Sequence, residues 1–156
     1  LLRVMREDVC YVIVGDGPDR ERLELFRDNI RGASQIFILG HRTDAIELLP
    51  HCDLLWNGSL YEGQSNVILE AMQCGVAVIA SDIPGNRDLI EHDRTGLLYP
   101  LSNVDDLTRL SHLLLNDKPR RDTLTKNAQQ HVQQEHSVEQ MISRHANYYR
   151  AKVSNR

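Results

Sequence analysis

The chain has 156 residues, which is the length of one ordinary domain. Its 18 Lys and Arg residues against 22 Asp and Glu give a formal net charge of −4, which argues against a broad basic surface for nucleic acid or an anionic membrane. Hydrophobic residues make up 41% and charged residues 26%, so a disordered or collagen-like chain is excluded. No apolar run approaches the ~18 residues of a membrane-spanning helix.

The first two thirds of the chain alternate expected strands with expected helices. Each strand is apolar on both faces, which is typical of a parallel sheet covered by helices on both sides. The pattern predicts an α/β fold with a doubly wound parallel sheet. Strands are expected at residues 10–15, 35–40, 53–58, 76–81 and 96–100, and helices from Pro18 and at 43–49, 65–74 and 86–90.

Beyond Pro100 the pattern indicates helices only. Asn103 is a plausible N-cap for a helix over 103–115, and residues 137–151 predict a final helix. The segment 118–135 is so poor in apolar residues that we expect a helix largely in solvent, with His131 and His136 on its surface. Residues 1–6 resemble the end of a helix without a preceding strand, so we expect the sequence to begin inside a larger protein.

The three cysteines cannot all pair with one another, and none has the C-x-x-C spacing of zinc or redox sites. Cys10 opens an apolar run and Cys74 precedes a glycine at an expected helix end. We therefore expect both to be small buried hydrophobic residues, and Trp56, at the end of a strand, to belong to the core. The cysteine usage favours a reducing, cytoplasmic location.

In a parallel sheet, ligands bind at the carboxyl ends of the strands. One such turn, Gly15-Asp-Gly17, supplies two glycines of a G-x-G-x-x-G fingerprint, but Arg20 occupies the third position and no acidic residue follows at the expected spacing. A simple strand-to-helix turn is the preferred interpretation. Arg87, near the same crevice, is interpreted as a surface arginine rather than a phosphate ligand.

The loop 60–66 has the highest density of candidate groups. Glu62 and Gly63 precede a helix whose expected N-cap is Ser65, and Glu70 follows Glu62 by eight positions. Helical side chains lean toward the N-terminus, so the Glu70 carboxylate is expected to approach Glu62. The buried stripe of the helix is expected to comprise Val67, Ile68, Ala71 and Met72.

Two acids at this position suit several kinds of chemistry. A glycosidase pair would have to flank a bond, and a metal site would need a third ligand such as His41 or His51. As hydroxyl acceptors, the two carboxylates fit a sugar and a ribose, while the backbone N–H groups of residues 63–67 could hold a phosphate. The residues by themselves leave open both a nucleotide-sugar site and a capped surface helix with two solvated glutamates.

The segment YEGQSNVILEAMQCGVAVIASDIPGNRDLI resembles the E-x7-E region of retaining glycosyltransferases with the GT-B fold, especially glycosyltransferase family 4 (group 1). The resemblance continues through VIVGDGPDRERLE, FILGHRTDAIELLPHCDLL and DRTGLLYPLSNVDDL, and so covers nearly all of residues 12–115. It implies that residues 1–156 form the Rossmann-like donor-binding domain of such an enzyme, with C-terminal helices. The first strand and the acceptor-binding N-terminal domain would precede Leu1.

The resemblance also implies a role for individual residues. Glu62 matches the catalytic first acid, which contacts donor-sugar hydroxyls and positions the sugar without forming a covalent bond. Glu70 matches the acid that accepts the ribose hydroxyls. The other donor-binding positions implied are Gly15, Gly17, Gly40, His41, Arg42, Gly63, Gln64, Ser65, Asn66 and Val67. The chain departs from the family pattern at Gly58, where proline is usual, and at Pro84-Gly85, where a glycine pair is usual.

The implied function is transfer of a hexose-type sugar from a nucleotide diphosphate sugar, expected to be a UDP-sugar, to a glycan, lipid or small molecule. No metal or cofactor is expected. Because the basic residues that neutralise the diphosphate are expected before Leu1, we expect this chain alone to be inactive. The implied partners are the donor, the chain's own acceptor domain and, through that domain, the inner face of the membrane; nucleic acid is not expected. The alternatives are a nucleotide-sugar epimerase of the same fold and a non-catalytic nucleotide-sugar binding module.

Overall fold

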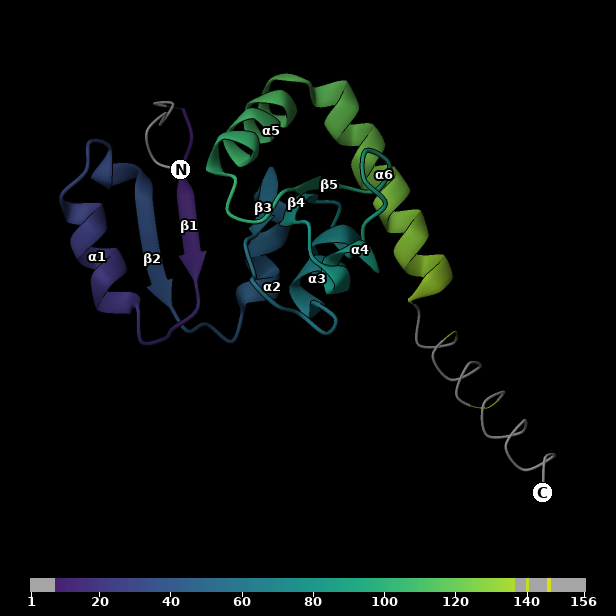
Figure 1. Ribbon diagram of the computed structural model, residues 1–156, viewed down its shortest axis with the longest axis horizontal. Helices are drawn as coiled ribbons and strands as arrows, with labels where there is room; N and C mark the ends of the chain where they lie inside the picture. The colour runs from purple at the N-terminus through teal and green to yellow at the C-terminus, as the bar shows by residue number, and fades with distance from the viewer. Residues whose placement is uncertain (1–7, 137–139, 141–145, 147–156) are drawn as a thin grey trace. The chain divides into compact units, whose positions relative to one another are not determined.

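The computed structural model describes residues 8–136, 140 and 146, and the chain divides into two compact units, residues 1–48 (unit 1) and 49–156 (unit 2) (Figure 1). Each unit contains its own sheet, and every strand pair is parallel. The predicted α/β class with parallel strands is therefore confirmed. The features expected at residues 1–6 and over most of 137–151 lie outside the described residues.

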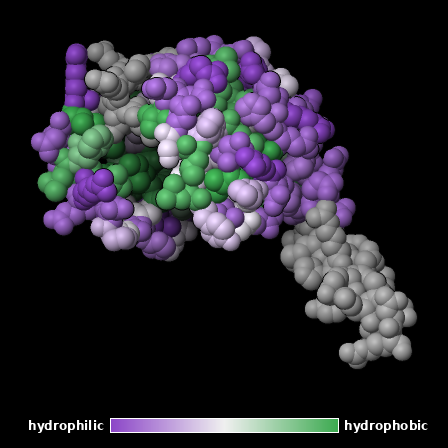
Figure 2. Space-filling model, viewed as in Figure 1, coloured by the Kyte–Doolittle hydropathy of each residue, from purple (hydrophilic) through white to green (hydrophobic). Residues whose placement is uncertain are grey.

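Unit 1 consists of a two-stranded sheet with helical connections. Strand β1 (Tyr11–Val14) pairs with β2 (Ile36–Gly40), and helix α1 (Arg20–Asp28) with the 3-10 turn η2 (Ala33–Gln35) connects them; the short α2 (Ala45–Leu48) follows. Several apolar side chains of both strands remain 38 to 47% exposed, namely Val12, Ile13, Val14, Phe37 and Leu39. Hydrophobic surface of this unit is visible in green in Figure 2. The prediction that Cys10 is buried is wrong, because Cys10 leads into this exposed strand.

Unit 2 is organised around one strand that is buried along its whole length. Strand β4 (Ala77–Ser81) lies between β3 (Leu54–Asn57) and β5 (Leu97–Tyr99), and every β4 residue is buried. Alternate side chains of a strand point to opposite faces. Val78 and Ala80 therefore enter one hydrophobic core, while Ala77 and Ile79 enter another.

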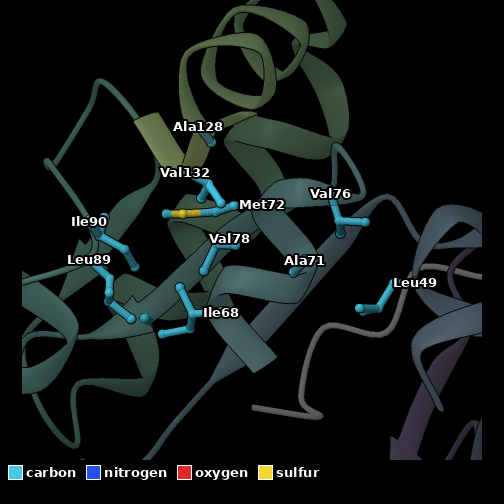
Figure 3. Packing of buried hydrophobic residues seen from close by; sticks show 11 residues of the cluster. Leu49, Ile68, Ala71, Met72, Val76, Val78, Leu89, Ile90, Ala128 and Val132 are labelled. Atoms are coloured by element: carbon cyan, nitrogen blue, oxygen red, sulfur yellow. The ribbon is translucent and has the colours of Figure 1, made fainter. Parts of the chain in front are cut away.

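Helices cover both faces of this sheet. Helix α3 (Asn66–Gln73) packs Ile68, Ala71 and Met72 into the core that contains Val78, which we call the α3 core (Figure 3). Helix α5 (Val104–Asn116) packs Leu107, Leu110 and Leu114 into the opposite core, the α5 core. The 3-10 turn η3 (Leu49–His51) and the short helix α4 (Pro84–Arg87) complete the elements before α5.

Local sequence signals account for the helix ends. Asn103 accepts a hydrogen bond from the Asp106 N–H at 3.0 Å and so is the N-cap of α5, as predicted. Helix α3 ends at Gln73 and is followed by Gly75, whose positive φ of 74° allows its N–H and that of Val76 to return to the Met72 and Ala71 carbonyls. Helix α4 begins at Pro84, two residues before the predicted start, because proline needs no N–H partner in a first helical turn.

Helix α6 (Lys118–Glu135) is mostly polar, as predicted, but one narrow stripe is buried. Leu124 enters the α5 core, and Ala128 and Val132 enter the α3 core. This packing corrects the prediction for His131, whose side chain is only 19% exposed and lies 3.6 Å from the Glu91 carboxylate. His136 is also half-buried. Among the described helices, none is long and apolar enough to cross a membrane.

We expect Leu114→Ala to lower the free energy of unfolding of unit 2 by about 2 to 5 kcal/mol, because it would leave a cavity in the α5 core. Leu114 is 0% exposed. The single tryptophan, Trp56, packs against the same core, as expected, so its fluorescence during urea unfolding reports on unit 2. The control Leu60→Ala makes the same change at a side chain that is 75% exposed and should cost under about 0.5 kcal/mol. Equal effects of the two variants would contradict the assigned core.

Candidate functional site

Two loops meet at the carboxyl end of the unit 2 sheet. Residues 58–65 connect β3 to α3, and residues 82–83 connect β4 to α4. Because β3 and β4 are parallel neighbours, both loops leave the sheet at the same edge. This edge carries Glu62, the predicted catalytic acid.

A group of buried polar side chains holds these loops together. Asn57, Ser81 and Asn86, which we call the loop anchor, are 0 to 7% exposed. The Asn86 side-chain amide donates to the Ser81 carbonyl at 2.9 Å, and the Ser81 hydroxyl donates to the Ser59 carbonyl at 2.6 Å. Buried polar groups need partners, so this network restricts the path of the loop. Sequence reasoning missed the loop anchor, although the polar residues at the ends of two apolar strands, Asn57 and Ser81, were a signal for it.

Glu62 is half-buried and is held on two sides. Its Oε1 accepts a hydrogen bond from the Ser59 hydroxyl at 2.7 Å. A Cβ atom at Gly85 would lie 2.3 Å from the Glu62 carbonyl oxygen, so only glycine permits this approach of α4 to the loop. The departure from the family pattern at Pro84-Gly85 thus retains the glycine that this contact requires.

The start of α3 leaves backbone N–H groups without a side-chain cap. Ser65 occupies the predicted N-cap position with extended backbone, but its hydroxyl makes no cap hydrogen bond and instead accepts from the Asn57 amide at 3.2 Å. The first N–H groups of a helix have no partner within it and carry partial positive charge. Gly63 has open space where a Cβ would lie, so the backbone here is accessible.

The helix itself differs from the prediction at one residue. Val67 was expected in the buried stripe but is 40% exposed, whereas Ile68, Ala71 and Met72 are 0% exposed. Ile68, Ala71 and Met72 form the stripe of this short helix that packs into the α3 core, and Val67 lies outside this stripe. Its exposed position places Val67 on the surface with Asn66.

Glu70, the second acid, is half-buried on α3. Within the described part of the chain, its carboxylate has no hydrogen-bond or ion-pair partner, in contrast to that of Glu62. Glu70 therefore offers a free pair of acceptor oxygens.

Gln64, another predicted donor-binding residue, is exposed, and its amide nitrogen lies 3.3 Å from Nδ1 of His136.

The remaining predicted residues lie in unit 1. The Gly15 N–H donates to the Gly40 carbonyl at 2.8 Å, which brings the ends of β1 and β2 together. The Gly17 N–H donates to the Asp16 carboxylate at 2.9 Å. His41 and Arg42 are exposed beyond β2, and the Arg42 guanidinium pairs with Asp44 and lowers the pKa of that carboxyl. The predicted residues thus form two groups, one in each unit.

Other charged groups near the unit 2 site already have partners. Arg87 pairs with Asp82 at 2.6 Å and lowers the pKa of the Asp82 carboxyl, in agreement with its interpretation as a surface arginine. Asp53 and His51 precede β3 and so lie at its amino end, away from these loops; Asp53 pairs with Arg121 at 3.1 Å, and His51 is exposed. In the described ranges, no three His, Cys, Asp or Glu side chains are grouped to hold a metal ion.

Comparison with known proteins shows which family this chain resembles in sequence. The family model described as glycosyl transferases group 1 matches residues 1–131. The chain is 33% identical over 130 residues to an N,N'-diacetylbacillosaminyl-diphospho-undecaprenol alpha-1,3-N-acetylgalactosaminyltransferase of Campylobacter jejuni, covering 81% of this chain and 33% of that protein. It is 31% identical over 112 residues to the UDP-Gal:alpha-D-GlcNAc-diphosphoundecaprenol alpha-1,3-galactosyltransferase of Escherichia coli, covering 71% and 29%.

Solved structures agree with the sequence relatives. The Anabaena protein HepE, crystallised with UDP and with UDP-glucose, is 26% identical and superposes with TM-scores of 0.85 and 0.82, covering 94% of this chain and 42% of HepE. The chain spans about a third of the length of the two transferases above. The family match covers most of the chain and the fold matches as well, so this chain belongs to the group 1 glycosyltransferases, which have the GT-B fold.

Proposed function

We propose that this chain forms the donor-binding part of a retaining glycosyltransferase. Its donor is a nucleotide diphosphate sugar, a UDP-sugar by our proposal, and its acceptor is a glycan, lipid or small molecule. The observation that carries the proposal is the contrast between the two acids at the α3 end of the sheet. Glu62 is bonded by Ser59, while Glu70 is half-buried and its carboxylate has no partner among the residues that the structure describes.

The uncapped start of α3 supports a diphosphate beside these acids. Ser65 does not occupy the first N–H groups, so they remain available for anionic oxygens. The Gly63 backbone is open, which allows close approach of a ligand. We propose that these N–H groups hold the diphosphate, that Glu70 accepts the ribose hydroxyls and that Glu62 accepts hydroxyls of the sugar.

Unit 1 carries the other predicted donor-binding residues. We propose that the turn containing Gly15 and Gly17 lies beside the donor and that the loop of Gly40, His41 and Arg42 lies beside its nucleobase. HepE binds UDP and UDP-glucose, and the Escherichia coli relative is named for UDP-Gal. Both support a uridine nucleotide as the donor of this chain.

The proposed reaction exchanges one bond at the anomeric carbon. The bond to the diphosphate oxygen breaks, an acceptor oxygen bonds on the same face, and the acceptor proton leaves with the diphosphate. Helix N–H groups stabilise the charge that develops on the departing diphosphate. Glu62 holds the sugar for this displacement and forms no covalent bond. The proposed setting is the cytoplasm, or the inner face of the membrane for a lipid acceptor.

We expect Glu70→Ala to weaken UDP binding by about 1.5 to 3 kcal/mol, which is roughly 10- to 150-fold in Kd, because two charge-assisted hydrogen bonds to ribose are lost. Isothermal titration calorimetry with UDP measures the effect. Asp105→Ala is the matched control, since it removes one exposed carboxylate on α5, on the opposite face of the sheet. Unchanged UDP affinity in Glu70→Ala would exclude the proposed ribose contact.

Glu62→Ala should distinguish the affinity for the donor sugar from the affinity for the nucleotide. We expect UDP affinity to stay within about twofold, while the additional affinity for a UDP-sugar over UDP is lost. The measurement is the ratio of Kd for UDP to Kd for the best-bound of UDP-glucose, UDP-galactose and their N-acetyl derivatives. If Glu62→Ala abolishes UDP binding and Glu70→Ala has no effect, the proposed orientation of the donor is reversed.

Metal removal tests the proposed independence from divalent cations. Two acids without a third ligand should not form a tight divalent site, so replacing magnesium with EDTA should change the Kd for UDP by less than about twofold. Calorimetry in matched buffers of equal ionic strength provides the comparison. A large loss of affinity in EDTA would point to a metal-bridged diphosphate and against the proposal.

A further inference from the structure

Ser59 is bonded through three different atoms at the carboxyl end of the unit 2 sheet. Its hydroxyl donates to Glu62 Oε1 at 2.7 Å, and its N–H donates to Asn57 Oδ1 at 3.3 Å. Its carbonyl accepts from the Ser81 hydroxyl at 2.6 Å. Ser59 is half-buried, so solvent competes only partly for these bonds. A serine hydroxyl has a single proton, and here it is directed at Glu62.

The support behind Ser59 is buried. Ser81 ends β4 and is 0% exposed, and Asn86, also 0% exposed, donates to its carbonyl at 2.9 Å and to its hydroxyl at 3.2 Å. The orientation of the Ser59 backbone is therefore set by the central strand and by α4. Movement of Ser59 would break its bond to Ser81, a side chain that is closed to solvent and has little chance of replacing that bond with one to water.

The Glu62 backbone is confined from the opposite side. A Cβ at Gly85 would lie 2.3 Å from the Glu62 carbonyl oxygen and 2.9 Å from the Gly63 carbonyl oxygen. With the backbone confined, the orientation of the Glu62 carboxylate depends on its side-chain torsions. Among the described residues, the Ser59 hydroxyl is the group that forms a hydrogen bond with this carboxylate and so restrains these torsions.

We propose that Ser59 is a positioning residue for the donor sugar and acts through Glu62. By occupying Oε1, it turns the other carboxylate oxygen, Oε2, toward a sugar hydroxyl. A carboxylate that is already oriented loses less freedom when the sugar binds. The inference rests on the proposed function, because it assumes that Glu62 contacts the donor sugar.

The test compares the ratio of Kd for UDP to Kd for the best-bound UDP-hexose in the full 156-residue chain and its variants. Ser59→Ala should lower this ratio by about 3- to 10-fold and leave UDP affinity within about twofold, as expected for one hydrogen bond. Ser59→Thr keeps the hydroxyl and should restore the ratio. Ser111→Ala is the matched control, since it removes a buried hydroxyl that donates to the Leu107 carbonyl at 2.7 Å in α5.

A double-mutant cycle with Glu62→Ala distinguishes positioning from a general structural role. If Ser59 acts only through Glu62, the double variant should have the same ratio as Glu62→Ala alone. Additive losses, reduced UDP affinity in Ser59→Ala or failure of Ser59→Thr to restore the ratio would overturn the inference. Should Ser59→Ala not fold, Ser59→Cys keeps the side-chain size with a weak donor, and an unchanged ratio there would also overturn it.

The two proposals fail in different ways. If Glu62→Ala lowers the ratio and Ser59→Ala does not, only the role of Ser59 is refuted. If Glu62→Ala leaves the ratio unchanged, the sugar contact proposed for Glu62 is refuted and the role of Ser59 with it.

Discussion

The complete burial of β4 is the constraint on which unit 2 depends. A strand with side chains buried on both faces requires a hydrophobic cover on each, and α3 and α5 provide these covers with α6 completing both. The same strand ends in Ser81, a buried polar residue that must find partners at the sheet edge. The hydrophobic arrangement and the polar anchor of the candidate site are thus two consequences of one strand.

The polar groups at this edge divide into those that support the loop and those that remain free. Ser65 stands at the N-cap position, but it bonds Asn57 and leaves the helix N–H groups uncapped. Arg87 is paired with Asp82, so its charge is partly compensated. Within the described residues, Glu70 keeps an unoccupied carboxylate. Groups suited to an anion and to hydroxyls therefore stay available beside a rigid frame.

Local signals predicted the elements well, and the errors arose where burial depends on distant neighbours. Asn103 and Gly75 act at the helix ends where the sequence placed them, because caps depend on adjacent residues. Cys10 and Val67 were expected to be buried, but apolar character does not reveal which face meets a core. His131 was expected in solvent, but three apolar residues on α6 suffice to bring its ring against Glu91.

By itself, the sequence determined the order of strands and helices, the parallel α/β class and the family, because alternating apolar runs and the spacing of Glu62 and Glu70 are properties of the chain in one dimension. Only the tertiary structure decided that Ser59 bonds Glu62, that Ser81 and Asn86 hold Ser59, and that Gly85 contacts the Glu62 backbone. These contacts join residues from two strand ends and a later helix. Their partners are selected by the parallel pairing of β3 and β4, which brings the two loops to one edge and which no local pattern encodes.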